Sequence, residues 1–239
     1  MCAKNIDFDF YKRILNELCF QNQKFEEFTR AGTKKSYYEF IRSINRATTI
    51  DIDGFKHYIN FYDGVTKVCI VISDDCDYVI KIGFTDDGYQ GYAFLEESIY
   101  RAACAKNVEK FFAGCYLLGR FFAVDCYLMQ YADIDGSAVD DDVRRHISDD
   151  LDERGEKYND EDIDDAFYDI IDDCAYVEYL FPFYYNKEEV SKLLDFIYRY
   201  DINDLHNENI GYINGMLVLT DYSGFKSSNA VKTAKNLLA

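Results

Sequence analysis

Apolar residues recur at helical spacing over the first fifty residues of the chain. This three-to-four-residue period puts the apolar side chains on one face of each helix. Ala31-Gly32-Thr33 interrupts the pattern and separates two helical stretches. Their apolar residues are Phe8, Tyr11, Leu15, Leu18 and Cys19 in the first stretch, and Tyr37, Phe40, Ile41 and Ile44 in the second. We expect residues 1–55 to form an N-terminal helical extension that packs on the rest of the chain and carries no chemistry.

From residue 56 the apolar period changes to the one that is typical of β-strands. Short polar segments such as Asp63-Gly64 separate successive β-rich runs. The runs cover residues 57–62, 66–72, 77–84, 111–118 and 121–131. Gly119-Arg120 joins the last two runs, and a helix is expected at about residues 91–106, between the third run and the fourth. The pattern predicts a five-stranded antiparallel sheet within residues 56–131.

Helical periodicity returns in residues 132–239. Two acidic amphipathic helices are expected, joined by a loop at residues 153–159, and a third helix follows Pro182 at residues 188–200. The stretch 140–173 contains 16 Asp or Glu and only four Arg or Lys, so it carries most of the formal charge of −18. Two interpretations stay open. The acidic residues form a solvated helix face, or they form a surface that mimics nucleic acid or docks a basic partner.

Composition excludes several classes of protein. A chain of 239 residues can bury a sizeable core, as one large domain or as two lobes. The charge of −18 makes nucleic acid and anionic membrane surfaces poor partners. Eight Cys without C-x-x-C spacing, and no apolar stretch of membrane-spanning length, indicate a cytoplasmic protein with reduced thiols and no membrane segment. Only three His are present, so zinc is not expected.

The most informative stretch lies at residues 201–225. Its centre predicts a β-hairpin with arms at 210–213 and 216–220, turned by Asn214-Gly215. Asp204 and Asn209 precede the hairpin and Asp221 follows it, so two carboxylates and an amide can converge. Oxygen ligands of this kind suit Mg²⁺. The alternative is a polar Asx-rich loop beside an ordinary hairpin.

The motifs D-L-H-N-E-N at 204–209 and L-V-L-T-D-Y-S at 217–223 resemble the catalytic and metal-binding loops of the protein-kinase-like superfamily. The resemblance implies that Asp204 orients the acceptor hydroxyl, that Asn209 holds a metal, and that Asp221 bridges the metal to the phosphates. It also implies an α+β, two-lobed fold, with the sheet in the N-lobe. The mostly helical C-lobe, in residues 132–239, would be truncated.

The same family presents a strand lysine to the nucleotide phosphates and orients it with a helix glutamate. Tyr78-Val79-Ile80-Lys81 matches the V-A-I-K pattern in its last two positions. The helix at residues 91–106 carries Glu96 and Glu97, and we prefer Glu97 as the partner of Lys81. The alternative is an edge-strand lysine that faces solvent.

The resemblance further implies ATP and Mg²⁺ as cofactors, with residues 129–131 as the hinge that contacts adenine. The residues that would surround ATP are Gly64, Val68, Val79, Lys81, Met129, Gln130 and Tyr131. Some positions depart from the family pattern. The glycine-rich loop is reduced to Gly64, Ile202-Asn203 stands in place of the H-R of H-R-D, and D-F-G becomes D-Y-S.

Two functions from different classes are consistent with these patterns. The first is an ATP- and Mg²⁺-dependent phosphotransferase that moves the γ-phosphate to a hydroxyl, with a Ser/Thr protein as the expected substrate. The intact lysine, asparagine and two aspartates favour it. The second is a catalytically weak, kinase-fold binding or regulatory protein that acts by contact through its acidic surface. The reduced glycine loop favours this alternative.

Overall fold

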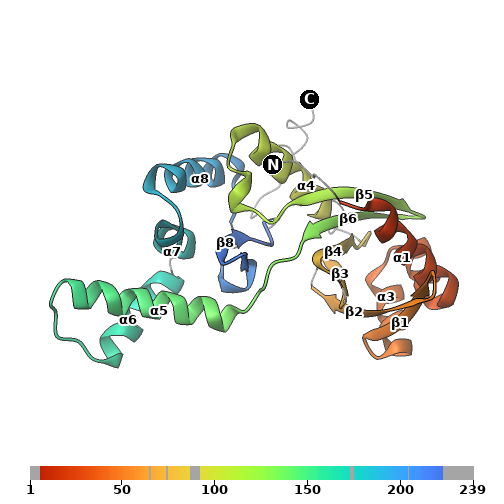
Figure 1. Ribbon diagram of the computed structural model, residues 1–239, viewed down its shortest axis with the longest axis horizontal. Coiled ribbons are helices and arrows are strands. Elements are labelled where there is room, and N and C mark those ends of the chain that lie inside the picture. Colours follow the sequence, from red (N-terminus) through yellow and green to blue (C-terminus); the bar gives the residue numbers. More distant parts are fainter. Residues whose placement is uncertain are drawn as a thin grey trace. The chain divides into compact units, whose positions relative to one another are not determined.

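The computed structural model describes residues 6–64, 66–73, 75–86, 92–172, 175–203 and 205–222 (Figure 1). The chain forms two compact units. Unit 1 comprises residues up to Tyr100 together with Gly114–Tyr131, and unit 2 comprises Arg101–Ala113 and the residues from Ala132 onward. The fold is α+β, and within the described ranges no helix is long and apolar enough to cross a membrane.

Three helices open unit 1. They are α1 (Phe8–Gln21), α2 (Gln23–Ala31) and α3 (Lys34–Ile44). Each begins at a polar residue whose side chain accepts a hydrogen bond from the first turn: Asp7, Asn22 and Thr33. The helical region was predicted, but its division at Asn22 was not. Asn22 has extended backbone angles, ends α1 and caps α2, so two helices stand where one was expected.

Six antiparallel strands form the sheet of unit 1, in the order β1-β2-β3-β4-β6-β5. Helix α4 (Tyr92–Lys106) lies between β4 and β5 in the chain. The strands are β1 (Ala47–Ile52), β2 (Phe55–Asp63), β3 (Lys67–Ile72), β4 (Asp75–Gly83), β5 (Cys115–Phe121) and β6 (Val124–Gln130).

The predicted number of five strands is wrong, because β1 lies in the region that was expected to be wholly helical. Ile50 and Ile52 are buried and alternate with exposed Asp51, which is the strand period. Asp53 and Gly54 both have positive φ, 55° and 84°, as a two-residue hairpin turn requires. The Asp53-Gly54 pair between two runs of alternating residues indicates a β-hairpin, and the helical interpretation did not take it into account.

The predicted turn at Gly119-Arg120 is also corrected. Both residues lie inside β5, where the register with β6 shifts next to Gly119. Because the strand register shifts at Gly119, this residue, whose φ is 141°, forms part of a bulge rather than a turn. The chain reverses just beyond β5, where Phe122 has φ 51°. A glycine inside a β-rich run can mark a bulge or a turn, and the sequence alone did not distinguish the two.

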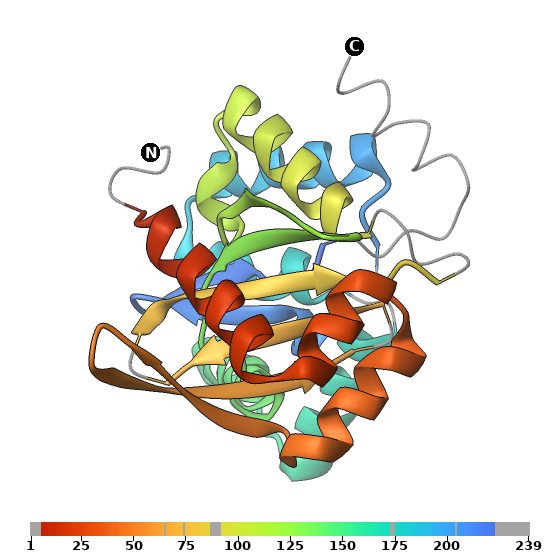
Figure 2. The same cartoon turned by 90° about the vertical axis from the view of Figure 1, so that its right-hand side faces the viewer.

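Helices α1–α3 cover one face of the sheet and share its hydrophobic core (Figure 2). Alternate strand residues such as Ile70 and Ile82 point into this core. From the helices, Phe25 and Phe40 meet edge to face, with ring centroids 5.1 Å apart. Phe40 also packs against Phe61 of β2. The N-terminal helices are thus part of the core of unit 1 rather than an appendage.

Unit 2 is mostly helical. Its helices are α5 (Gly136–Glu153), α6 (Asp160–Asp172), α7 (Tyr176–Tyr184) and α8 (Lys187–Tyr200). The two acidic helices are confirmed at the predicted positions, while α7, which contains Pro182, was not predicted. A hairpin of β7 (Ile210–Ile213) and β8 (Met216–Leu219) follows α8.

Replacing Phe40 tests whether the N-terminal helices belong to the core. Phe40 is fully buried, so F40A should lower the free energy of unfolding by about 3–5 kcal/mol, as truncation of a buried Phe does. The matched control is F20A in α1, because Phe20 is 86% exposed. It should change stability by less than about 0.5 kcal/mol. Urea unfolding measures both, and equal effects would contradict the shared core.

Candidate functional site

The face of the sheet opposite α1–α3 carries two lysines. Side chains alternate along a strand, so Lys67 and Cys69 of β3 point away from the core that holds Val68. Cys69 is paired with Lys81 across β3 and β4, which brings Lys81 to the same face. Strand register alone therefore brings two cations to one side of the sheet.

Glu96 of α4 joins the two lysines. Its Oε1 accepts from Lys67 Nζ at 2.7 Å and from Lys81 Nζ at 3.1 Å, and its Oε2 lies 3.4 Å from Lys81 Nζ. All three side chains are buried, and Glu96 is 0% exposed. A buried charge is costly unless it is paired and hydrogen-bonded, so these contacts explain how the charges are tolerated. We call these three residues the Lys67–Glu96–Lys81 cluster.

The predicted contact between Lys81 and an acidic residue of the following helix is present, but the preferred partner is corrected. Lys81 contacts Glu96, whereas Glu97 is half-buried at the next position of α4. One helical position rotates a side chain by about 100°, and the apolar stripe of the helix did not determine that angle closely enough. Lys67 was not assigned from the sequence, and its contact with Glu96 depends on strand pairing and on the position of α4.

Cys115 of β5 lies near the cluster and is buried. Burial raises the pKa of its thiol well above the ordinary value, and the negative charge of Glu96 adds to this effect. The thiol is therefore neutral at physiological pH and is not an activated nucleophile.

The residues predicted to surround ATP lie on both faces of the sheet of unit 1. Val79 is paired with Met129 across β4 and β6, and both share the face of Lys81. Val68 is fully buried in the opposite core, so its position does not support a role in ATP binding. The correction follows from the alternation of strand side chains, since Val68 directly follows Lys67.

Backbone groups of the predicted loop and hinge are engaged within unit 1. Gly64 N–H donates to the carbonyl of Lys67 at 2.9 Å, which closes the turn between β2 and β3. Gln130 N–H donates to Gly114 at 2.7 Å, and Tyr131 N–H donates to Asp77 at 2.8 Å. These three amides are hydrogen-bonded already, so a ligand at the hinge would have to use other groups.

In unit 2 the two predicted metal ligands, Asn209 and Asp221, lie at the open end of the hairpin. Asn214 and Gly215 turn it with φ values of 52° and 75°, as the sequence predicted. The carbonyl of Asn209 accepts from Thr220 N–H at 2.9 Å, so Asp221 follows directly across from Asn209. Asp204, the predicted catalytic aspartate, lies outside the described residues.

The donor set of this hairpin fits a hard cation only in part. Asn209 Nδ2 lies 3.0 Å from His206 Nε2, so the amide oxygen is the atom that a metal would take. Within the described ranges no group of three or more His, Cys, Asp or Glu could hold a metal ion. The assignment of Asn209 and Asp221 to Mg²⁺ stays a prediction, in which waters and phosphate oxygens would complete the metal's shell.

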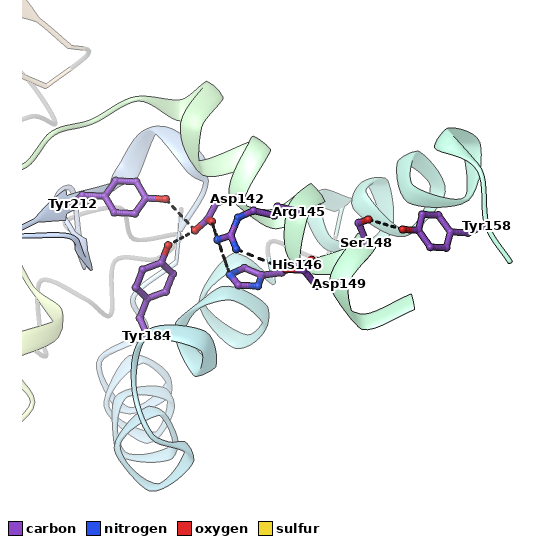
Figure 3. Close-up of polar contacts among 8 residues, drawn as sticks. All are labelled: Asp142, Arg145, His146, Ser148, Asp149, Tyr158, Tyr184 and Tyr212. Atoms are coloured by element: carbon purple, nitrogen blue, oxygen red, sulfur yellow. Dashed lines mark hydrogen bonds and ion pairs between the residues drawn. The ribbon is translucent and has the colours of Figure 1, made fainter. Parts of the chain in front are cut away.

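Helix α5 supports the hairpin through Asp142 (Figure 3). One oxygen of Asp142 accepts from Tyr212 of β7 at 3.2 Å and from Tyr184 of α7, and the other accepts from Arg145. The ring of His146, one turn along α5, stacks on Phe183 with centroids 3.7 Å apart. Tyr212 thereby ties the hairpin to two helices of unit 2.

These contacts determine the protonation states of Asp142 and Tyr184. Burial raises the pKa of Asp142, but the hydrogen bonds from Tyr184 and Arg145 outweigh it and hold this pKa below the ordinary value. Burial, followed by the hydrogen bond to Asp142, raises the pKa of Tyr184. Asp142 is thus ionised, and Tyr184 is a neutral donor, across the physiological range.

The acidic stretch 140–173 is consequently not uniform. Asp142 faces inward, and Asp140 accepts from Asn207 Nδ2 at 2.9 Å, in the turn before the hairpin. Others, such as Asp141 and Asp149, are exposed. The sequence interpretation treated the stretch as one surface, because the tyrosines and the asparagine that select the inward carboxylates lie far along the chain.

Comparison of the sequence with protein-family models and with curated proteins gave no match. Function is therefore inferred from the motifs at 78–81, 204–209 and 217–223 and from the geometry of each of the two units.

Replacing Asp142 should loosen the support of the hairpin. In D142A the hydroxyls of Tyr184 and Tyr212 lose their acceptor, which should cost on the order of 1–3 kcal/mol of unfolding free energy. The control D141A removes an exposed carboxylate from the neighbouring position and should cost less than about 0.5 kcal/mol. Chemical unfolding at pH 7 measures the difference.

The Asp142 contribution should also depend on pH, with a defined sign. Because the pKa of Asp142 is lowered in the folded state, its stabilisation is present above the ordinary Asp pKa and is lost on acidification. The stability difference between wild type and D142A should shrink as pH falls below about 4. A difference that stays constant from pH 7 to pH 3 would contradict the ionised network.

Proposed function

We propose that this protein is an ATP- and Mg²⁺-dependent phosphotransferase that moves the γ-phosphate to a hydroxyl group. The observation that carries the proposal is the buried contact between Lys81 and Glu96. A strand lysine held by a helix glutamate is the arrangement that protein-kinase-like enzymes use on nucleotide phosphates. A buried ammonium kept charged by a carboxylate suits an oxyanion ligand.

Each residue has a distinct role in the proposed reaction. Lys81 holds the α- and β-phosphates, and Glu96 orients Lys81. Asn209 and Asp221 hold Mg²⁺, which when bound neutralises charge on the phosphates. Asp204 aligns the acceptor hydroxyl for in-line attack and accepts its proton. Placement and charge neutralisation supply most of the rate in such chemistry.

The proposed acceptor is the side-chain hydroxyl of a serine or threonine in a protein substrate, which Asp204 would align. The alternative function is a catalytically weak, kinase-fold protein that binds a basic partner through its acidic surface. The exposed carboxylates of α5 and α6, Asp141 and Asp149 among them, are compatible with it. Nucleotide binding separates the two functions, since only the phosphotransferase requires it.

Two aspartate variants should separate nucleotide binding from transfer. D221N removes a metal ligand, so Mg²⁺-ATP should bind more weakly and turnover should fall. D204N removes only the contact to the acceptor, so binding should persist while turnover falls by about 10²-fold or more. Calorimetric titration with Mg²⁺-ATP and radiolabelled transfer to a generic acceptor measure the two quantities.

The control for both variants is D141N, which neutralises an exposed carboxylate of α5 and should leave binding and transfer unchanged. Wild-type transfer by D204N would end the assignment of Asp204. Absence of any stabilisation of the wild-type chain by millimolar Mg²⁺-ATP would contradict the phosphotransferase and favour the binding protein.

A further inference from the structure

A pocket of about 370 Å³ lies within unit 2, between the C-terminal end of α4 and one face of α8. A pocket of this volume is large enough to hold a small organic ligand. Its lining residues are Lys106, Val108, Lys192, Asp195, Phe196 and Arg199. We propose that this pocket, which we call the α4–α8 pocket, binds a small phosphate monoester. None of its lining residues has a role in the proposed function.

Helical spacing brings the α8 residues of the pocket together. Positions 192, 195, 196 and 199 follow the three-to-four-residue period that places side chains on one side of a helix. Lys106 is the last residue of α4. The next residue, Asn107, has φ 56°, which ends the helix and lets Val108 line the same pocket. The end of one helix and a continuous face of another therefore form this site.

Contacts beside the pocket hold its two sides together. Lys110 forms an ion pair with Glu189 of α8, and the ring of Phe112 packs edge to face on Phe196, with centroids 5.5 Å apart. Phe196 and Val108 are both buried, whereas the three cations of the pocket are exposed. The pocket thus combines an apolar part that is fixed by packing with cations that a ligand from solvent can reach.

The α4–α8 pocket is positively charged, although the whole chain is strongly acidic. Three cations and one carboxylate give its lining a formal charge of +2, in a chain whose net charge is −18. Among the described residues, Lys106 and Arg199 form no ion pair, and Lys192 forms one with Glu188 at 2.8 Å. Glu188 is 81% exposed, so water screens this pair and it contributes little to stability. All three cations are therefore available to an anionic ligand.

A phosphate monoester matches this lining better than a carboxylate does. Its phosphate carries a charge of about −1.5 to −2 at neutral pH and three acceptor oxygens, so it can neutralise the lining and accept from more than one cation. The planar guanidinium of Arg199 suits paired oxygens, and the lysines act as point charges. The apolar residues Val108 and Phe196 favour an ester with a small apolar group over inorganic phosphate.

Two other roles for these cations make different predictions. Lys106 and Arg199 lie in the last turns of their helices, where a cation is stabilised by the helix dipole. If this is their only role, their removal lowers stability but leaves the affinity of the folded protein for an anion unchanged. If anions are attracted only by the general charge of exposed cations, removal of any exposed cation weakens binding equally. A specific site restricts the loss of affinity to residues of the pocket.

Calorimetric titration of the full chain with phenyl phosphate tests the site. R199M and K106M should each bind about tenfold more weakly than wild type, as the loss of one hydrogen bond to a charged group implies. The matched control K187M removes an exposed cation of α8 that does not line the pocket, and it should bind like wild type. D195N removes a carboxylate that repels the phosphate, so it should bind more tightly than wild type.

A wild-type chain that binds no phenyl phosphate at millimolar concentration would overturn the proposal. So would an affinity that R199M and K106M leave unchanged, or that K187M lowers to the same extent. Benzoate and inorganic phosphate should bind more weakly than phenyl phosphate, and equal affinity for either would overturn the assignment of a phosphate ester. The two variants alter exposed side chains on different helices, so if one does not fold by circular dichroism the other decides. A loss of phosphotransfer alone leaves this site standing, because its residues are not those proposed to hold ATP.

Discussion

The ion pairs that Lys67 and Lys81 form with the buried carboxylate of Glu96 are the interaction that allows unit 1 to bury these charged side chains. The carboxylate accepts hydrogen bonds from two lysines that the strand register brings to one face of the sheet. Removing the carboxylate would leave two buried ammonium groups without this partner, a change that commonly costs several kcal/mol. Helices α1–α3 occupy the other face, and they bury the apolar half of each strand. The sheet thus separates the face that packs against the N-terminal helices from the face that carries the Lys67–Glu96–Lys81 cluster.

In unit 2, side-chain hydrogen bonds hold a short hairpin in one position. A two-stranded hairpin is only marginally stable by itself in water. Tyr212 links it to Asp142 of α5, and the buried Tyr222 donates to the carbonyl of Ala113 at 2.8 Å just beyond β8. These contacts hold both ends of the hairpin, so Asn209 and Asp221 are borne by a supported element. Part of the acidic stretch is therefore structural, although the composition alone suggested only a surface.

Local patterns predicted the elements that depend on local chemistry. The Asn214-Gly215 turn, the helix that carries Glu96, and the loop between α5 and α6 follow from turn residues and periodicity within a few positions. The missed features depend on partners that lie far apart in the sequence. Whether Lys67 faces solvent or Glu96 is decided by which face of the sheet the N-terminal helices cover. Whether Asp142 or Asp141 turns inward is decided by Tyr184 and Tyr212, and no local pattern contains that information.

Covalent labelling by an acyl-phosphate derivative of ATP tests the central claim most directly. Its reactive carbonyl is attached to the terminal phosphate, so a lysine beside a bound nucleotide is modified faster than other lysines, and excess ATP blocks that modification. Peptide mapping by mass spectrometry then identifies the labelled lysines. We predict modification of Lys81 that is blocked by excess Mg²⁺-ATP, with no such protection at exposed Lys56. Labelling confined to exposed lysines and insensitive to ATP would contradict a phosphate-binding role for Lys81.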